Sequence, residues 1–291
     1  MIRDAPPRRL VYLGTPEIAV PPLRALVDEG FEIALVVTRT DKRRGRGSQL
    51  MPSPVKAAAV ELGLRVSHDV DDVLDAHADL GVVVAFGQLL KPHVLDALRM
   101  VNLHFSLLPR WRGAAPVERA LLAGDDQTGV CLMQLEAGLD TGPVFRRAVV
   151  EIGQSMTAAE LRSELVRVGT RLLVDELRAG LGTPEPQSGE PTYAAKISPE
   201  ELHIDWTRSA IEIDRLVRVG GAWTTLNGRR LKIIAADLID RDHQPSGDLV
   251  GARVGGLRLI MVQPEGKPTM AFAEFARGAR LAGIEHLGRS E

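Results

Sequence analysis

The sequence predicts an α/β fold, in which a doubly wound, mostly parallel sheet of the Rossmann-like kind is followed by a small C-terminal β-barrel-like, OB-like domain. Two observations support this. Short apolar runs alternate with helical patterns through the first two-thirds of the chain, and hairpin patterns dominate the last third. The length of 291 residues, more than one average domain and fewer than three, agrees with two domains.

The predicted strands are short runs rich in Val, Ile and Leu, several of them apolar on both faces, as expected of a covered parallel sheet. They are Leu10–Leu13, Ile33–Val37, Val82–Phe86, Met100–His104 and Val130–Leu135. Helix starts lie between and after these runs: Pro22 and Pro54 suit a first helical turn, and Thr157 with Glu160 forms a capping box. Alternation of this kind is typical of a doubly wound domain.

The pattern changes after Leu177. Residues 180–191 are rich in Gly and Pro, and we predict a catalytic domain over 1–187, a linker over 188–200 and a C-terminal domain over 201–291. In the last domain, Asn227-Gly228 predicts a type I′ hairpin turn, and Gly255-Gly256 predicts a second hairpin between Asp248–Val254 and Leu257–Val262.

Composition excludes several classes of protein. No apolar stretch approaches the ~20 residues of a membrane helix, and no apolar segment follows the charged N-terminus as in a secretory signal. Cys131 is the only cysteine, which excludes an internal disulfide and a cysteine-based zinc site. We therefore expect a cytoplasmic protein that does not contact a membrane.

Charge is distributed unevenly, although the net charge of −2 argues against a generally basic nucleic-acid binder. Between Thr38 and Lys56 the chain has a single acidic residue, Asp41, and six basic residues: Arg39, Lys42, Arg43, Arg44, Arg46 and Lys56. Such a run is most often a solvated loop, and contact with nucleic acid is the alternative.

The first strand–helix turn, Gly14-Thr15-Pro16-Glu17, lacks the G-x-G-x-x-G pattern that binds a pyrophosphate, and no P-loop is present. Dehydrogenase and kinase functions are therefore disfavoured.

Polar side chains alternate at the end of one predicted strand. Asn102, His104 and Ser106 share one face of this strand, since side chains alternate with period two. The carboxyl ends of strands line the ligand crevice of open α/β sheets. An Asn-x-His pair is consistent with catalysis and also with a structural hydrogen-bonded pair.

Asp140 lies in a loop after the next predicted strand, between Gly138 and Gly142, whose backbone freedom could direct the carboxylate inward. An Asx-turn is the commoner use of such an Asp. A carboxylate close to His104 would favour imidazolium, and an imidazolium beside a side-chain amide suits the oxyanion that forms when an amine attacks a carbonyl. This combination indicates acyl transfer without a metal or a covalent nucleophile.

Six motifs, in order and spacing, resemble the methionyl-tRNA formyltransferase family over almost the whole chain. They are GTP at Gly14–Pro16, the GRG…LMPSPVK loop at Gly45–Lys56, AFG at Ala85–Gly87, NLHFSLLPRWRGAAP at Asn102–Pro116, GLDTGP at Gly138–Pro143 and IDW at Ile204–Trp206. The resemblance implies transfer of a formyl group from 10-formyltetrahydrofolate to the amine of methionyl-initiator tRNA, in support of translation initiation, by a metal-independent enzyme that we expect to be a monomer.

The resemblance also implies roles for individual residues. It assigns formyl transfer to Asn102, His104 and Asp140. It assigns folate binding to Ser106, Leu107, Leu108 and Pro109, with Phe86 and Gly87 in a segment bordering the pterin. In that family a loop matching Arg39–Gln49 grips the acceptor stem, which implies tRNA contacts for Arg44 and Arg46.

Three alternatives remain at this point. A sugar-nucleotide N-formyltransferase has a similar catalytic domain and a C-terminal β module, but RWRGAAP and LMPSPVK favour the tRNA enzyme. Glycinamide ribonucleotide formyltransferase is a single domain without the basic insertion. A non-catalytic folate- or RNA-binding homologue is disfavoured by the intact Asn102, His104 and Asp140.

Overall fold

The computed structural model describes residues 4–43, 50–282 and 285–288, and the chain divides into two compact units. Unit 1 is drawn from Met1–Val117, Gln127–Glu151 and Leu161–Ala195, and unit 2 from Glu118–Asp126, Ile152–Glu160 and Lys196–Glu291. No helix in the described part of the chain combines the length and the apolar character that crossing a membrane requires.

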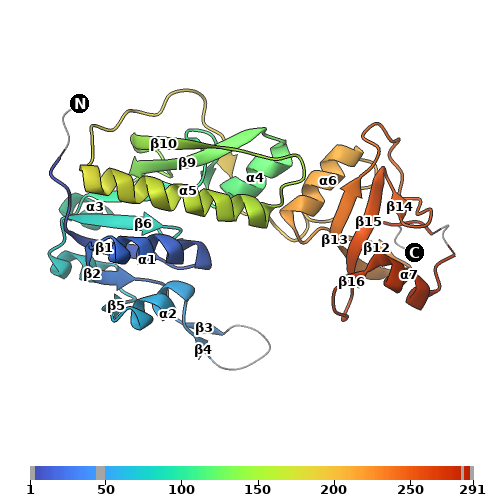
Figure 1. Ribbon diagram of the computed structural model, residues 1–291, viewed down its shortest axis with the longest axis horizontal. Coiled ribbons are helices and arrows are strands. Elements are labelled where there is room, and N and C mark those ends of the chain that lie inside the picture. The colour runs from blue at the N-terminus through green and yellow to red at the C-terminus, as the bar shows by residue number, and fades with distance from the viewer. Residues whose placement is uncertain (1–3, 44–49, 283–284, 289–291) are drawn as a thin grey trace. The chain divides into compact units, whose positions relative to one another are not determined.

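Unit 1 is built on a seven-stranded sheet with the order β10-β9-β7-β6-β1-β2-β5 (Figure 1). These strands are β1 (Arg9–Gly14), β2 (Glu32–Val37), β5 (Val66–Ser67), β6 (Leu80–Val84), β7 (Met100–His104), β9 (Gln127–Gln134) and β10 (Val144–Glu151). The five strands from β5 to β7 are parallel, and β9 and β10 are antiparallel to their neighbours. The predicted mostly parallel sheet is thus confirmed.

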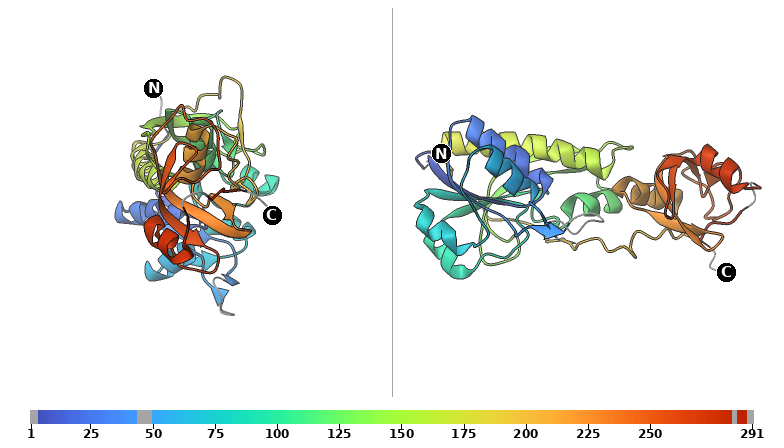
Figure 2. Two further views of the ribbon diagram at one scale, coloured as in Figure 1. Left: turned by 90° about the vertical axis from the view of Figure 1, so that its right-hand side faces the viewer. Right: turned by 90° about the horizontal axis from the view of Figure 1, so that it is seen from below.

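Helices cover both faces of this sheet, which confirms double winding (Figure 2). One face carries α1 (Val20–Asp28), α2 (Pro54–Glu61) and most of α5 (Ala158–Ala179), and the other carries η2 (Asp71–Ala76) and α3 (Pro92–Ala97). The short helix η1 (Glu17–Ala19) precedes α1, and most of α4 (Pro116–Ala123) belongs to unit 2. Two two-stranded pairs lie outside the seven-stranded sheet: β3 (Lys42–Arg43) with β4 (Leu50–Met51), and β8 (Arg112–Gly113) with β11 (Tyr193–Ala194).

Local sequence signals explain where the helices begin. The first turn of α1 accommodates proline because the amide hydrogens of that turn have no partner within the helix. Before α2, the Ser53 hydroxyl accepts a hydrogen bond from the Lys56 amide. Before α5, Thr157 and Glu160 cap each other reciprocally, as the sequence predicts.

One predicted strand ends earlier than expected, and one observed strand of unit 1 was not predicted. Strand β6 ends at Val84 rather than Phe86, because Ala85 has φ +46° and turns the chain. Strand β10 was not predicted: the exposed pair Arg146 and Arg147 interrupts it, so it lacks a continuous apolar run.

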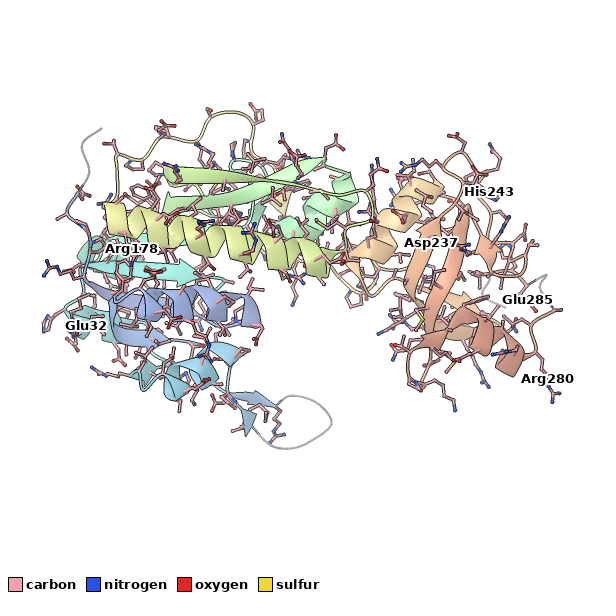
Figure 3. The ribbon with its side chains drawn as sticks, viewed as in Figure 1. Glu32, Arg178, Asp237, His243, Arg280 and Glu285 are labelled. Carbon is pink, nitrogen blue, oxygen red and sulfur yellow. The ribbon has the colours of Figure 1, made fainter. Side chains whose placement is uncertain are left out.

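Unit 2 contains a curled antiparallel sheet with the order β12-β13-β15-β14, to which β16 adds beside β15. Its elements are α6 (Ala210–Val219), β12 (Trp223–Leu226), β13 (Arg229–Leu238), β14 (Arg253–Val254), β15 (Leu257–Pro264), β16 (Met270–Ala271) and α7 (Phe272–Ala279). Register shifts near Ala235 bend β13 against β15. Asp237 of β13, labelled in Figure 3, forms an ion pair with Arg258 of β15. The sheet packs around Trp206, Ile213 and Phe272. The predicted β-barrel-like domain is therefore confirmed.

Both predicted hairpin turns of unit 2 form. Asn227 and Gly228 have φ of +49° and +70°, as a type I′ turn requires, and Gly255 and Gly256 also have positive φ. The strand predicted over Asp248–Val254 is wrong for most of its length: the chain turns at Gly251, which has φ +63°, so only Arg253–Val254 pairs with β15.

The chain after α5 is hydrogen-bonded within unit 1. Glu185 exchanges backbone hydrogen bonds with Val144, and β11 pairs with β8 up to Ala194. The last change along the chain from unit 1 to unit 2 follows Ala195.

Candidate active site

The predicted site residues converge at the carboxyl edge of the parallel strands. Thr15 follows β1, Phe86 follows β6 and His104 ends β7. A hydrogen bond of 3.1 Å from the Thr15 hydroxyl to the Phe86 carbonyl joins the first two of these ends. This edge of an open α/β sheet is where ligands bind.

Strand β7 directs its two predicted catalytic residues to one face. Asn102 is in register with Val83 of β6 and, like His104, lies on the sheet face opposite α5. Leu103 points the other way, where its side chain packs closely against Gly169 of α5. The alternation predicted from the sequence thus holds across the sheet.

His104 is buried, and each of its ring nitrogens faces an oxygen that can only accept a hydrogen bond. Nε2 lies 2.9 Å from the carbonyl oxygen of Trp111, so it carries hydrogen and donates. Nδ1 lies 3.6 Å from Oδ2 of Asp140. That distance exceeds a direct hydrogen bond but permits an electrostatic interaction with little screening by water, since the two side chains are only 7% and 13% exposed.

Asp140 occupies the loop between β9 and β10 in a left-handed conformation with φ +50°. Its Oδ2 accepts a hydrogen bond of 2.8 Å from the Gly113 amide. Trp111 and Ala85, at the same edge of the sheet, also have positive φ, with values of +63° and +46°. Unfavourable backbone conformations of this kind cost about 1–3 kcal/mol each and cluster where function fixes geometry.

Asn102 offers an unused amide. Its side chain is partly exposed, and among the described residues it makes no hydrogen bond to another part of the chain. Both amide hydrogens and the carbonyl oxygen are therefore available to a bound molecule.

The predicted folate-contacting residues divide into two groups. Phe86 and Leu108 are only 3% exposed and pack in the core, and the Ser106 hydroxyl donates to the Arg110 carbonyl at 2.6 Å, so these side chains already have structural partners. Leu107 and Pro109 are partly exposed and Gly87 is exposed. Among these residues, Gly87, Leu107, Pro109 and the backbone can therefore contact a ligand.

The two predicted tRNA-contacting residues, Arg44 and Arg46, lie outside the described residues. The described residues beside them include an ion pair of 2.7 Å between Asp41 and Lys56, which joins the segment after β2 to α2. A further hydrogen bond between the buried hydroxyls of Thr38 and Ser53 joins the same two segments.

Cys131 lies in β9 opposite His104 and is fully buried. Burial away from water raises the pKa of its thiol to about 11. At neutral pH it is therefore protonated and unsuited to nucleophilic attack. Among the described residues, no group of His, Cys, Asp and Glu side chains has the arrangement of a metal site.

Sequence reasoning missed two polar residues after α5 that contact the site loops. The Gln187 amide group bonds to the carbonyls of Asp140 and Gly142, and the Thr192 hydroxyl accepts a hydrogen bond of 2.8 Å from the Trp111 amide. Both lie in or next to a stretch rich in Gly and Pro that suggested only a linker, and no local pattern distinguishes them.

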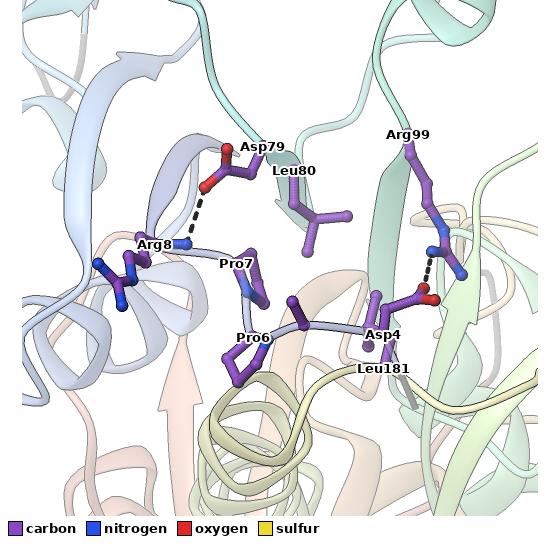
Figure 4. A pocket seen from close by; sticks show the side chains of 9 residues that line it. Asp4, Pro6, Pro7, Arg8, Asp79, Leu80, Arg99 and Leu181 are labelled. Atoms are coloured by element: carbon purple, nitrogen blue, oxygen red, sulfur yellow. Dashed lines mark hydrogen bonds and ion pairs between the residues drawn. The ribbon is translucent and has the colours of Figure 1, made fainter. Parts of the chain in front are cut away.

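A cavity of about 390 Å³ lies at the opposite edge of the sheet (Figure 4). Its lining includes Arg8, Leu80 and Arg99, which precede or begin β1, β6 and β7, and an ion pair of 2.6 Å joins Arg99 to Asp4. The cavity is therefore separated from His104 by the length of the strands.

Comparisons with known proteins agree on one family. Residues 8–177 match the formyl transferase family, and residues 196–280 match the formyl transferase C-terminal domain. The methionyl-tRNA formyltransferase of Roseobacter denitrificans is 44% identical to this chain, in an alignment that covers 94% of this chain and 96% of that protein.

Solved structures share the fold. The N-formyltransferase of Helicobacter canadensis, solved with folinic acid and dTDP-3-aminofucose, has a TM-score of 0.64 at 16% identity over 88% of this chain and 99% of that one. HypX of Aquifex aeolicus with tetrahydrofolic acid has a TM-score of 0.64 at 15% identity, over 96% of this chain and 48% of that one. The structural neighbours establish the fold alone, and the sequence identity along nearly the full length establishes that this chain belongs to the methionyl-tRNA formyltransferase family.

Proposed function

We propose that the chain transfers the formyl group of 10-formyltetrahydrofolate to the free amine of methionyl-initiator tRNA, and so supplies the formylated tRNA for translation initiation. The observation that carries the proposal is the convergence of three groups: the unpaired Asn102 amide, the buried His104 ring and the Asp140 carboxylate 3.6 Å from that ring. Membership of the family selects the two substrates.

The proposed chemistry is nucleophilic acyl transfer. The lone pair of the methionyl amine attacks the formyl carbon, a carbon–nitrogen bond forms, and the carbonyl electrons move to oxygen. The bond to N10 of the folate then breaks, N10 takes its electron pair, and the proton lost by the amine goes to N10. Atoms and charge balance without a metal or a redox partner.

Each of the three residues has a task that its surroundings support. The Asn102 amide and the ring of protonated His104 stabilise the oxyanion, because a fixed donor in a water-poor site is worth about 10²-fold or more in rate. Asp140 stabilises the imidazolium through its nearby negative charge. An incoming carbonyl oxygen competes with the Trp111 carbonyl for the hydrogen on Nε2 of His104.

For the co-substrate, we propose contacts from the segment Ser106–Pro109 and from Phe86 and Gly87. The exposed Gly87 and the partly exposed Leu107 and Pro109 support this proposal, whereas the buried side chains of Phe86 and Leu108 indicate that those two residues act through their backbone.

For the tRNA, we propose contacts from Arg44 and Arg46, with residues 201–291 acting as a second domain that helps to position the acceptor. We further propose that residues 1–187 form the catalytic domain, that 188–200 connect the two domains, and that the protein acts as a monomer in the cytoplasm. The concentration of basic residues between Thr38 and Lys56 supports the assignment to tRNA.

A direct assay tests the proposed function. The chain is incubated with 10-formyltetrahydrofolate and methionyl-initiator tRNA, and acid gels separate formylated from unformylated tRNA. We expect formylation of initiator tRNA at a higher kcat/KM than that of elongator methionyl-tRNA or of a dTDP-amino sugar. Preference for the amino sugar would show a sugar-nucleotide enzyme, and folate binding without turnover on any amine would show a non-catalytic homologue.

A further inference from the structure

Gln187 links the two loops that surround His104 and Asp140. Its Nε2 donates hydrogen bonds to the carbonyls of Asp140 at 2.7 Å and Gly142 at 2.8 Å. Its Oε1 accepts from Arg112, at 3.1 Å from Nε and 2.6 Å from Nη2. We propose that Gln187 is a positioning residue for formyl transfer, which fixes the Asp140 carboxylate relative to His104; this inference rests on the roles proposed above for those two residues.

The chemistry of the partners determines the orientation of the Gln187 amide. A guanidinium can only donate hydrogen bonds and a backbone carbonyl can only accept them, so the oxygen must face Arg112 and the nitrogen must face the loop. Both amide hydrogens and both oxygen lone pairs are then used. Neither an apolar side chain nor a carboxylate can replace this set of four contacts.

The Asp140 loop needs this support. Asp140 has φ +50°, and the Gly142 backbone lies so close to the Gln134 carbonyl that a side chain has no room there. The Gly113 amide holds one carboxylate oxygen of Asp140, and Gln187 holds the backbone on either side of Thr141. Removal of Gln187 therefore releases the backbone while leaving the carboxylate on a single hydrogen bond.

The second loop, residues 110–113, contacts two of the three predicted catalytic residues, His104 and Asp140. Its Trp111 carbonyl accepts from Nε2 of His104, and its Gly113 amide donates to Asp140. Arg112, between these two, reaches Gln187. Gln187 thus connects the loop that holds His104 with the loop that carries Asp140, and the separation of 3.6 Å between Nδ1 and Oδ2 depends on both.

The test compares Gln187→Glu with wild type in the formylation assay. The carboxylate keeps an acceptor for Arg112 but cannot donate to the two carbonyls, and we expect kcat to fall about 10–10²-fold, as for a displacement of roughly 1 Å at a reacting group. KM for each substrate should change less than about twofold, because a residue that acts only by positioning Asp140 does not contribute to substrate binding. Glu190→Gln, an exposed residue of the same segment, is the matched control and should match wild type.

A double-mutant cycle separates positioning from a general structural effect. If Gln187 acts through Asp140, then Gln187→Glu should lower kcat less than about twofold when Asp140→Asn is already present. A full additional loss in that background would overturn the proposal, as would a variant with wild-type kcat. Gln187→Ala provides the same comparison should the glutamate variant not fold. A wild-type chain that formylates no methionyl-tRNA would instead contradict the proposed function, so the two failures are distinguishable.

Discussion

Nδ1 of His104 lies 3.6 Å from Oδ2 of Asp140, although His104 ends strand β7 and Asp140 lies in the loop after β9. The opposite ring nitrogen of His104 donates to the Trp111 carbonyl. A neutral imidazole has one hydrogen and one lone pair, so it would leave the lone pair facing an oxygen. The ring of His104 is thus flanked by two oxygens, the carbonyl oxygen of Trp111 and a carboxylate oxygen of Asp140.

The first prediction concerns His104 itself. His104→Ala removes the proposed oxyanion donor, and we expect kcat for formylation to fall at least about 10²-fold, with folate affinity changed little. Steady-state kinetics and folate titration measure both. Turnover close to that of wild type would exclude a catalytic role for His104.

The second prediction concerns the charge of Asp140. Asp140→Asn keeps an oxygen that can accept from the Gly113 amide, so the loop should retain its structure while the negative charge beside His104 is lost. We expect kcat to fall about 10-fold or more, because the imidazolium is no longer stabilised. An unchanged kcat together with an unchanged thermal midpoint would mean that the carboxylate serves only as a hydrogen-bond acceptor.

The third prediction concerns the basic run of the sequence. Arg44→Ala combined with Arg46→Ala should raise KM for methionyl-tRNA more than KM for folate, and should flatten the salt dependence of tRNA binding by about two charges. Arg171→Ala with Arg178→Ala removes the same charge from exposed positions of α5 and serves as the control. Equal effects of the two double variants would show that the basic run is a solvated surface with no specific contact to tRNA.

The fourth prediction concerns Cys131. With a pKa of about 11 and no exposed surface, the thiol should be about one part in a thousand ionised at pH 8. We expect a disulfide reagent such as DTNB to react at least about 10²-fold more slowly with the native protein than with the protein in denaturant. Rapid reaction of the native protein would show that β9 opens readily.

The fifth prediction concerns the pH dependence of stability. Hydrogen bonds from the amides of Arg9 and Arg8 lower the pKa of the Asp79 carboxyl (Figure 4 shows the bond from Arg8). A carboxyl whose pKa is lower in the native state stabilises the fold at any pH above its pKa in the unfolded chain, which is about 4. This stabilisation disappears as the pH falls through the pKa of the native state.

Asp79→Asn should therefore lower the thermal midpoint at pH 7, and the difference from wild type should shrink below about pH 4. Thermal unfolding between pH 7 and 3 measures this trend. Asp75→Asn, at another exposed carboxylate, is the control. A difference that stays constant with pH would show that the charge of Asp79 contributes nothing.

Much of the secondary structure follows from short-range patterns. The apolar runs predicted β1, β2 and β7, and the capping box at Thr157 predicted the start of α5. The turn at Asn227-Gly228 was equally clear. These signals involve residues within a few positions of one another, so the chain order alone contains them.

The sequence by itself determined the class of the fold, the family and the residues Asn102, His104 and Asp140 as candidates. The tertiary structure decided how these residues meet. Strand β9 runs antiparallel to β7, so the loop that follows β9 begins at the far end of β7 and must return along the sheet to bring Asp140 to His104. Gly113, 27 positions from Asp140 in the chain, and Gln187, 47 positions from it, hold that loop. Hydrogen bonds between such distant residues depend on the path of the whole chain, which no local periodicity or cap encodes.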